Sequence, residues 1–299
     1  MKEKIKLYGS ILILVIFVPY LLTLYLQGGS FFFSGKNSEA MEQEARLVGI
    51  LAKEIPVSYE TECLKAQAVI ARTNLRLQQK ENTDKKDQAE NQEWTQAEMK
   101  AAWGDNYEQN LEKIENAISQ TEGEVITYKG KMINAAYHAA SNKKTRSASE
   151  VPGQEDAAYL VGVDSESDIT ADHFLYIGYM QKQEFAEAVQ SVFEGETIVA
   201  DELPATLEIV ERDSADYVTK VKYGKTTVNG EALRKALNLN SACFYFSELE
   251  GQIRILTKGI GHGLGFSQYG ANELAKRGYK YRELLDYYYH EIKIEHMEN

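Results

Sequence analysis

Residues 62–73, ECLKAQAVIART, are the stretch of this chain that decides the fold. Apolar residues recur in it at helical spacing, and alanines at positions 66, 68 and 71 leave a slim surface against which another element can pack closely. Pro56 ends a preceding helix, expected over residues 41–53, because a proline restricts the residue before it to extended conformations. Ser58 or Thr61 can then cap the next helix. The stretch therefore predicts a closely packed helix with Glu62 in its first turn.

A second informative stretch, residues 259–272 (GIGHGLGFSQYGAN), lies far downstream. Its dense glycines permit positive φ angles and a close approach of a ligand to the backbone. His262, Gln268 and Tyr269 add hydrogen-bond donors, acceptors and a stacking face, which a sugar chain requires. The alternative interpretation is a buried structural turn. A nucleotide site is disfavoured, because the stretch lacks the lysine of a phosphate-binding loop and does not follow a strand of the Rossmann pattern.

The N-terminal residues predict the compartment. Residues 1–6 are a lysine-containing tail, and residues 7–26 carry no charge over about 30 Å of helix, enough to cross a bilayer. The positive-inside rule leaves the tail in the cytoplasm and the rest of the chain outside. Residues 27–38 then form a tether to an ectodomain over residues 39–299. A cleaved signal peptide is the competing interpretation, although the residues after position 26 make a poor cleavage site.

Charge and cysteine content narrow the class of partner. The formal net charge is −12, and removing the net +3 of residues 1–36 leaves −15 on the rest. Such an acidic ectodomain argues against binding to nucleic acid or to anionic lipid. Cys63 and Cys243 are too few and too far apart for a disulfide scaffold, so we expect one bridge or two isolated thiols. No spacing typical of a zinc site is present.

The order of expected elements indicates an α+β fold, in which a mixed helix and antiparallel-strand ectodomain follows a single-pass membrane helix. Residues 124–128 and 131–137 predict a β-hairpin, and the polar run 78–93 predicts a solvated loop. Residues 175–250 form a more variable region that we expect to be an inserted, smaller subdomain. The further helices are expected near residues 111–118, 182–193, 231–237, 269–276 and 281–289, and the further strands near 206–211, 217–223, 244 and 253.

Glu62 has a structural and a catalytic interpretation. A carboxylate in the first turn of a helix interacts favourably with the macrodipole, for up to about 1 kcal/mol. The same position lowers a carboxyl pKa, whereas a general acid near pH 7 needs a raised one. A catalytic Glu62 therefore needs apolar neighbours that desolvate it, for which Leu264, Phe266 and Tyr269 are the expected wall. Glu54 and Glu60 are the rival carboxylates.

His138 ends a predicted strand, and a lone histidine there is more often structural than functional. A hydrolase triad of Ser141 with a histidine is disfavoured, because no Gly-x-Ser-x-Gly elbow is present. The tyrosines at 287–289 have the helical spacing of core residues.

Together and in this order, the two informative stretches resemble the stage II sporulation protein D family, and so do segments 54–56, 137–145, 159–160 and the region from 272 through the tyrosine helix. The amidase-enhancer proteins share this domain. The resemblance implies a lytic transglycosylase, which cleaves between N-acetylmuramic acid and N-acetylglucosamine and leaves a 1,6-anhydro end. It places the catalytic carboxyl at Glu62. One carboxyl suffices, because the second nucleophile is the C6 hydroxyl of the sugar itself.

The resemblance further implies a substrate of glycan strands stripped of stem peptides, partnership with stage II sporulation proteins P and M, and action at the mother-cell membrane that engulfs the forespore. Lys143, Lys144 and Arg146 form a basic cluster that could read the exposed lactyl carboxylates. Relatives with a zinc site carry ligands where this chain has Ala139 and Ala140, so we expect no metal and no cofactor. A non-enzymatic wall-binding module of the amidase-enhancer type and a purely structural scaffold remain as alternatives. The candidate substrate-binding residues are Arg72, His138, Ser141, Lys143, Lys144, His262, Gln268 and Tyr269.

Overall fold

The computed structural model describes residues 38–81 and 93–297. The expected tail, membrane helix and nearly all of the tether lie outside the described residues, as does most of the polar run 78–93. Within the described part of the chain, no helix combines the length and the apolar character needed to cross a bilayer. The residues from Arg46 onward form one compact unit, with helices and antiparallel sheets interleaved as the α+β prediction requires.

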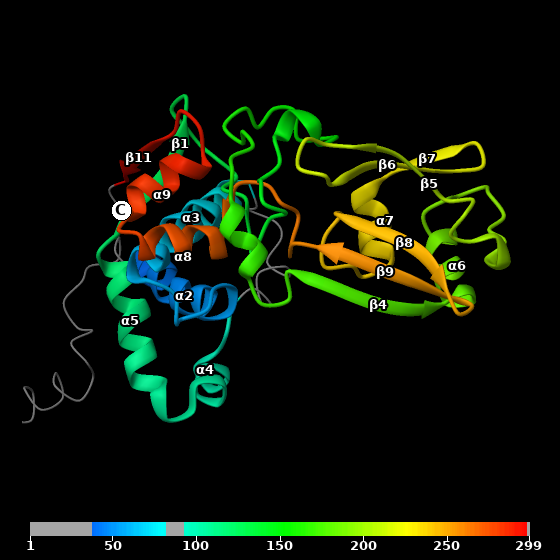
Figure 1. Cartoon of the computed structure of the whole chain (residues 1–299). Coiled ribbons are helices and arrows are strands. Elements are labelled where there is room, and N and C mark those ends of the chain that lie inside the picture. The colour runs from blue at the N-terminus through cyan, green and yellow to red at the C-terminus, as the bar shows by residue number, and fades with distance from the viewer. Residues whose placement is uncertain (1–37, 82–92, 298–299) are drawn as a thin grey trace, which may run out of the picture. The chain divides into compact units, whose positions relative to one another are not determined.

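Helix α3 (Thr61–Glu81) is the centre of the first hydrophobic core. Between Cys63 and Thr73 every residue except Lys65 is buried, which is typical of a helix that other elements surround. It packs against helices α5 (Tyr107–Ser119), α8 (Gln268–Lys276) and α9 (Tyr281–Tyr288) and strand β1 (Glu124–Tyr128). The predicted helix is thus confirmed, and it begins at Thr61 after α2 (Ser38–Glu54) (Figure 1).

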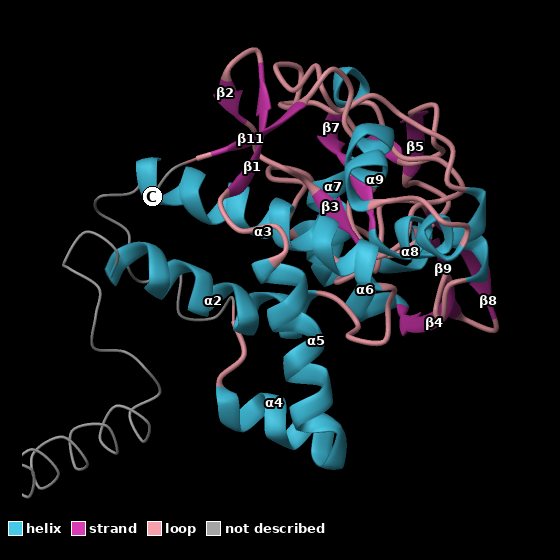
Figure 2. Cartoon of the chain, turned by 90° about the vertical axis from the view of Figure 1, so that its left-hand side faces the viewer, coloured by secondary structure: helices cyan, strands magenta, loops and turns pink. Residues whose placement is uncertain are grey.

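Two small sheets accompany this core. Strand β1 pairs in antiparallel fashion with β2 (Lys131–Met132) and with β11 (Lys293–His296) (Figure 2). Strand β3 (Tyr137–His138) pairs in parallel with β10 (Phe266–Ser267). The hairpin is confirmed, but its second strand, predicted over residues 131–137, ends at Met132, and Tyr137 belongs to β3. The side-chain amide of Asn74 accepts from the N–H of Ala135 at 2.8 Å and donates to its carbonyl at 3.0 Å, so these groups cannot continue the hairpin ladder.

A second hydrophobic core, which shares no residue with the first, belongs to the region between β4 and β9. Phe185, Tyr217 and Phe244 are buried in it. The expected inserted subdomain covers most of this region, and its status as a separate domain stays a prediction. The sheets of this region have the orders β4 (Leu175–Gln181)–β9 (Gln252–Lys258)–β8 (Phe244–Leu249) and β5 (Glu208–Arg212)–β6 (Val218–Tyr223)–β7 (Thr226–Asn229), with helices α6 (Lys182–Gln190) and α7 (Gly230–Ala236).

Helix α4 (Gln96–Trp103) and strands β4, β7, β10 and β11 are elements that the sequence did not predict. The start of α4 has a readable signal, because Thr95 and Glu98 form a capping box. Cys63 and Cys243 are both buried, free thiols and belong to different cores, so the structure has two isolated thiols and no bridge between them.

Candidate functional site

Glu54, the last residue of α2, lines an open hollow of about 350 Å³. The other lining residues are Asn74 of α3, the segment 134–137 that leads into β3, and His262 of the glycine stretch. A smaller cavity of about 140 Å³ also has Glu54, Asn74 and Tyr137 in its lining. Four parts of the chain that are distant in sequence therefore meet around one carboxylate.

Tyr137 holds the Glu54 carboxylate. Burial raises the pKa of Tyr137, and the charge of Glu54 and a hydrogen bond to its carboxylate raise this pKa further. The phenol therefore stays protonated and can donate to Glu54 at any physiological pH. The backbone carbonyl of Glu54 accepts from Nε2 of Gln268 at 2.9 Å, which fixes the end of α2. Glu54 also stands at the C-terminal end of a helix, where the macrodipole disfavours further negative charge.

Two histidines form a neutral wall beside this hollow. The ring of His262 accepts at Nδ1 from the N–H of Leu264 at 3.1 Å and hydrogen-bonds the backbone of Tyr137. Burial, followed by the charges of Arg234 and Arg146, lowers the pKa of His262 to about 4. The ring of His138 lies 5.8 Å away between centroids, and burial lowers its pKa to about 3. Both rings are therefore uncharged near pH 7.

Glu62 has different surroundings. One carboxylate oxygen accepts from Nζ of Lys65 at 2.8 Å, and the other accepts from the backbone N–H of Tyr281, the first residue of α9, at 2.9 Å. Burial on its own would raise the pKa of Glu62, but the hydrogen bonds from Lys65 and Tyr281 outweigh it and lower the pKa. These contacts hold the Glu62 carboxylate ionised and place it as a cap on α9, and its catalytic role stays a prediction.

The three residues that were expected to form an apolar wall around Glu62 have other partners in the structure. Leu264 and Phe266 are buried in the first core. The Tyr269 hydroxyl lies 3.0 Å from Oγ1 of Thr170 and donates to its carbonyl.

Besides His138, three of the expected substrate-binding residues are buried and bonded to the protein. Arg72 is 1% exposed and donates to the backbone carbonyls of Ile118 and Glu124. Gln268 is 4% exposed, and its Nε2 donates to the backbone carbonyl of Glu54 and to Oε1 of Gln67. These bonds join α3 to its neighbours, and the roles of Arg72 and Gln268 in substrate binding stay predictions.

Ser141 is the third of these residues, and it leads to a carboxylate that the sequence analysis missed. Its hydroxyl and its backbone N–H both donate to Oδ2 of Asp168 at 2.6 Å. The Ser267 hydroxyl donates to the same oxygen at 2.8 Å. Burial raises the pKa of Asp168 in spite of these bonds. Asp168 therefore joins the loop after β3 to the start of α8, and no motif around it announces this role.

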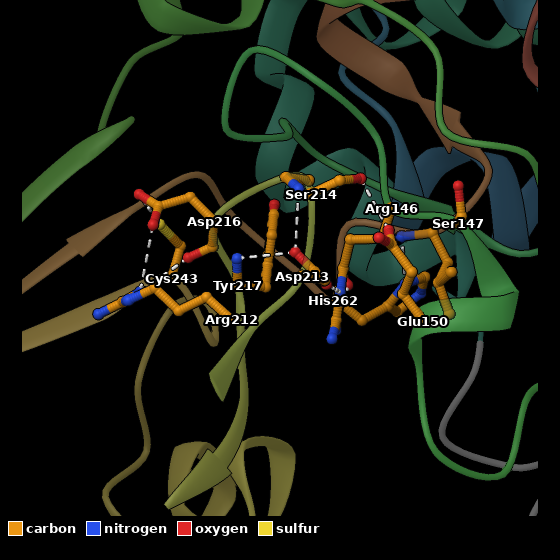
Figure 3. A network of polar contacts seen from close by, with 12 residues as sticks. Arg146, Ser147, Glu150, Arg212, Asp213, Ser214, Asp216, Tyr217, Cys243 and His262 are labelled. Carbon is orange, nitrogen blue, oxygen red and sulfur yellow. Dashed lines mark hydrogen bonds and ion pairs between the residues drawn. The ribbon is translucent and has the colours of Figure 1, made fainter. Parts of the chain in front are cut away.

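Arg146 corrects the expected basic cluster. Lys143 is exposed and Lys144 half-buried, but the side chain of Arg146 is 1% exposed. Its guanidinium pairs with Asp213 at 2.5 Å (Figure 3) and with Glu231 at 2.9 Å. It offers no charge to a ligand, because both acidic partners already neutralise it.

The same guanidinium ties the glycine stretch to the second core. Nη1 of Arg146 donates to the backbone carbonyl of His262 at 3.1 Å, and the guanidinium lies over the ring of Tyr217 at 4.8 Å. Arg146 is therefore a positioning residue, which holds His262 in place beside the hollow. No group of three or more His, Cys, Asp or Glu side chains in the described residues is arranged to hold a metal ion.

Comparison with known proteins assigns the class first. The family model described as stage II sporulation protein matches residues 35–128. Two curated relatives then give the particular family. The chain is 32% identical over 270 residues to stage II sporulation protein D of Bacillus amyloliquefaciens, with 87% of this chain and 76% of the relative covered. It is 31% identical, with the same coverage, to stage II sporulation protein D of Bacillus subtilis (strain 168).

This chain belongs to the stage II sporulation protein D family, as its motifs predicted. The amidase enhancer of Bacillus subtilis (strain 168) is a more distant relative, 25% identical over 291 residues, with 81% of this chain and 39% of that protein covered.

Proposed function

We propose that this chain is a lytic transglycosylase that cleaves peptide-stripped glycan strands of peptidoglycan, with Glu54 rather than Glu62 as its catalytic carboxyl. Membership of the family supports the substrate class. The observation that carries the choice of residue is the open hollow that Glu54 lines, where Tyr137 hydrogen-bonds its carboxylate. The carboxylate of Glu62 is occupied by an ammonium group and a helix N-terminus.

One carboxyl group in this hollow can perform both proton transfers. Protonated Glu54 gives its proton to the glycosidic oxygen as the bond from that oxygen to C1 breaks. The resulting carboxylate takes the proton from the C6 hydroxyl of the same muramic acid, and O6 bonds to C1. The products are a 1,6-anhydro end and a free C4 hydroxyl, and Glu54 regains its proton. No second carboxylate is required, because the attacking oxygen belongs to the substrate.

The neighbours of Glu54 act by position. The Tyr137 hydroxyl orients the carboxylate with a hydrogen bond that a neutral phenol retains throughout the reaction. The amide of Asn74 is committed to the backbone of Ala135, so it shapes the wall of the hollow. His262 is neutral near pH 7 and committed at Nδ1, so it does not compete for the transferred proton.

The cellular part of the proposal rests on the family and on the residues before Ser38. We propose that residues 7–26 anchor the chain in the mother-cell membrane, with the catalytic domain outside the cytoplasm. There it would act during forespore engulfment with stage II sporulation proteins P and M.

The activity is tested with the full-length chain in detergent micelles. The chain is incubated with peptide-stripped strands and, separately, with peptide-bearing strands, and the products are analysed by mass spectrometry. The proposal predicts 1,6-anhydro ends, faster from stripped strands. The matched control is the double variant Glu54→Gln, Glu62→Gln, which should give none. Hydrolytic reducing ends, or no cleavage of either substrate, would overturn the proposal.

A second candidate function is a non-enzymatic module that stimulates a partner amidase. The ion-paired Glu62 with its lowered pKa favours it, and so does the relationship to an amidase enhancer. Under this function the same double variant stimulates an N-acetylmuramoyl-L-alanine amidase as well as the wild type does. A wild-type chain that produces anhydro ends and leaves amidase rates unchanged rules it out.

A further inference from the structure

The sheet β4–β9–β8 turns one face into the second core and leaves the other face unburied. On the inner face, Ile253 and Ile255 of β9 and Phe244 of β8 are buried. On the outer face, none of the positions in the three strands is buried. We call this the outer sheet face. It comprises residues 175, 177, 179 and 181 of β4, residues 252, 254, 256 and 258 of β9, and residues 245, 247 and 249 of β8.

The outer sheet face is apolar to an unusual degree. Leu175 is 52% exposed, Ile177 41% and Tyr179 55%, and all three point to the same side of β4. Among the described residues β4 pairs with β9 alone, so it is an edge strand. A run of large exposed apolar residues on one edge strand is typical of a binding surface, because proteins otherwise avoid such edges.

The charges of this face oppose those of the rest of the protein. Arg254 lies opposite Tyr179 in the register, and Lys258 lies opposite Leu175. The outer sheet face contains these two cations and no acidic residue, in a chain of net charge −12. Nζ of Lys258 lies 4.8 Å from the ring centre of Tyr245. The acidic group beside this face, Asp216, pairs with Arg212 at 3.6 Å and accepts from the Tyr245 hydroxyl.

We propose that the outer sheet face binds a peptide-stripped glycan strand outside the catalytic hollow. The proposal rests on the substrate class given under the proposed function. The C–H faces of pyranose rings fit against Leu175, Ile177 and Tyr179, as sugars commonly pack on apolar and aromatic side chains. The lactyl carboxylates pair with Arg254 and Lys258, which lie on one side of β9 about 13 Å apart. A strand that retains its stem peptides has no such carboxylates.

The position of the sheet supports this ligand over a second copy of the chain. Strand β9 ends at Lys258, and the glycine stretch with His262 follows it directly. The N–H of Gly259 donates to the carbonyl of Phe174, so the Leu175 end of the face joins the loop that lines the Glu54 hollow. Two copies meeting at this face about a two-fold axis would place the same cations of both on one surface and bring two acidic molecules together.

The experiment measures binding of the full-length chain in detergent micelles to fluorescently labelled stripped strands, in the non-cleaving background Glu54→Gln, Glu62→Gln. Adding Arg254→Gln and Lys258→Gln should weaken binding roughly tenfold, because two exposed ion pairs are lost. Adding Ile177→Ser and Tyr179→Ser should weaken binding to stripped strands and to neutral chitooligosaccharides alike. The matched controls are Lys222→Gln, an exposed cation on β6, and Val210→Ser, an exposed apolar residue on β5, and both should leave binding unchanged.

Two outcomes would overturn the proposal. In the first, the Arg254 and Lys258 variants bind stripped strands as tightly as the controls do. In the second, sedimentation shows that the unaltered chain is a dimer and that the Ile177 and Tyr179 variants are monomers, which makes the face an interface between copies. Because binding is measured without cleavage, a failure of the proposed activity would appear only in the product analysis and would leave this result separate.

Discussion

The end of α2 and the start of α3 each carry a glutamate, and the structure treats the two in opposite ways. Glu62 lies at a helix N-terminus and also meets the N-terminus of α9, so two sources of positive potential hold its charge. Glu54 lies at a helix C-terminus, is held by a neutral phenol, and faces an open hollow. The difference teaches that a carboxylate inside a recognisable motif can be committed to structural contacts while another glutamate nearby lines a hollow.

The largest effect on stability is expected at the buried ion pair between Arg146 and Asp213, because Arg146 also holds His262 beside the Glu54 hollow. Asp213→Asn should lower the free energy of unfolding by about 3 to 5 kcal/mol, because it removes one partner of a buried ion pair. The matched control is Glu211→Gln, whose pair with Lys220 is half exposed and worth under about 1 kcal/mol. Urea unfolding of both variants measures this. Equal losses of unfolding free energy in the two variants would mean that the buried ion pair does not hold His262 in place.

Low pH should also lower the stability of the folded chain, through His262 beside the Glu54 hollow. His262 titrates near pH 4 in the folded chain and at its ordinary value of 6.5 when unfolded. The unfolded chain therefore binds more protons between these values, and stability falls as the pH drops from about 6.5 toward 4, by roughly 3 kcal/mol from this histidine. In His262→Asn, which keeps an acceptor for the N–H of Leu264, the loss between pH 7 and pH 4 should be smaller by about this amount. An identical loss would show that His262 is not the group responsible.

At the other glutamate, the replacement Glu62→Gln should lower the free energy of unfolding. Gln keeps an acceptor for the N–H of Tyr281 but loses the charge that Lys65 and the α9 terminus favour, so we expect a cost of about 1 kcal/mol. Thermal unfolding near pH 7 measures it, with Glu60→Gln, an exposed neighbour, as the control. A variant as stable as the wild type would contradict the capping role assigned to Glu62.

The smallest effect is expected from the loop after β3. With Arg146 buried, Lys143 and Lys144 are what remains of the expected basic cluster, and Lys144 is only partly accessible. Replacing both with Ala should weaken binding of stripped strands by about two- to threefold, less at high salt. Binding of neutral chitooligosaccharides is the control. A tenfold loss of affinity for stripped strands, without a loss for chitooligosaccharides, would show that this loop selects stripped strands.

Sequence patterns predicted the α+β class, most of the helices and the β1–β2 hairpin, because these depend on local periodicity and turn residues. The hollow depends on contacts that no local pattern contains. Parallel pairing of β3 with β10 brings His138 to the glycine stretch, and Arg146 ties this part of the chain to Asp213 in the intervening region. The motifs did not show that Ser141 and Gln268 are buried, because a buried polar residue and a ligand-binding one look alike in a sequence pattern. The substrate-binding roles of these two residues and of His262 stay predictions.

The most direct test compares two single variants on one substrate. The full-length Glu54→Gln and Glu62→Gln chains are incubated with peptide-stripped strands, and the rate of 1,6-anhydro product formation is followed by mass spectrometry. The account predicts that Glu54→Gln loses at least about 100-fold in rate, because general acid and base catalysis is removed. Glu62→Gln should stay within about threefold of the wild type at a temperature where both are folded. Wild-type rates from Glu54→Gln together with an inactive Glu62→Gln would contradict it.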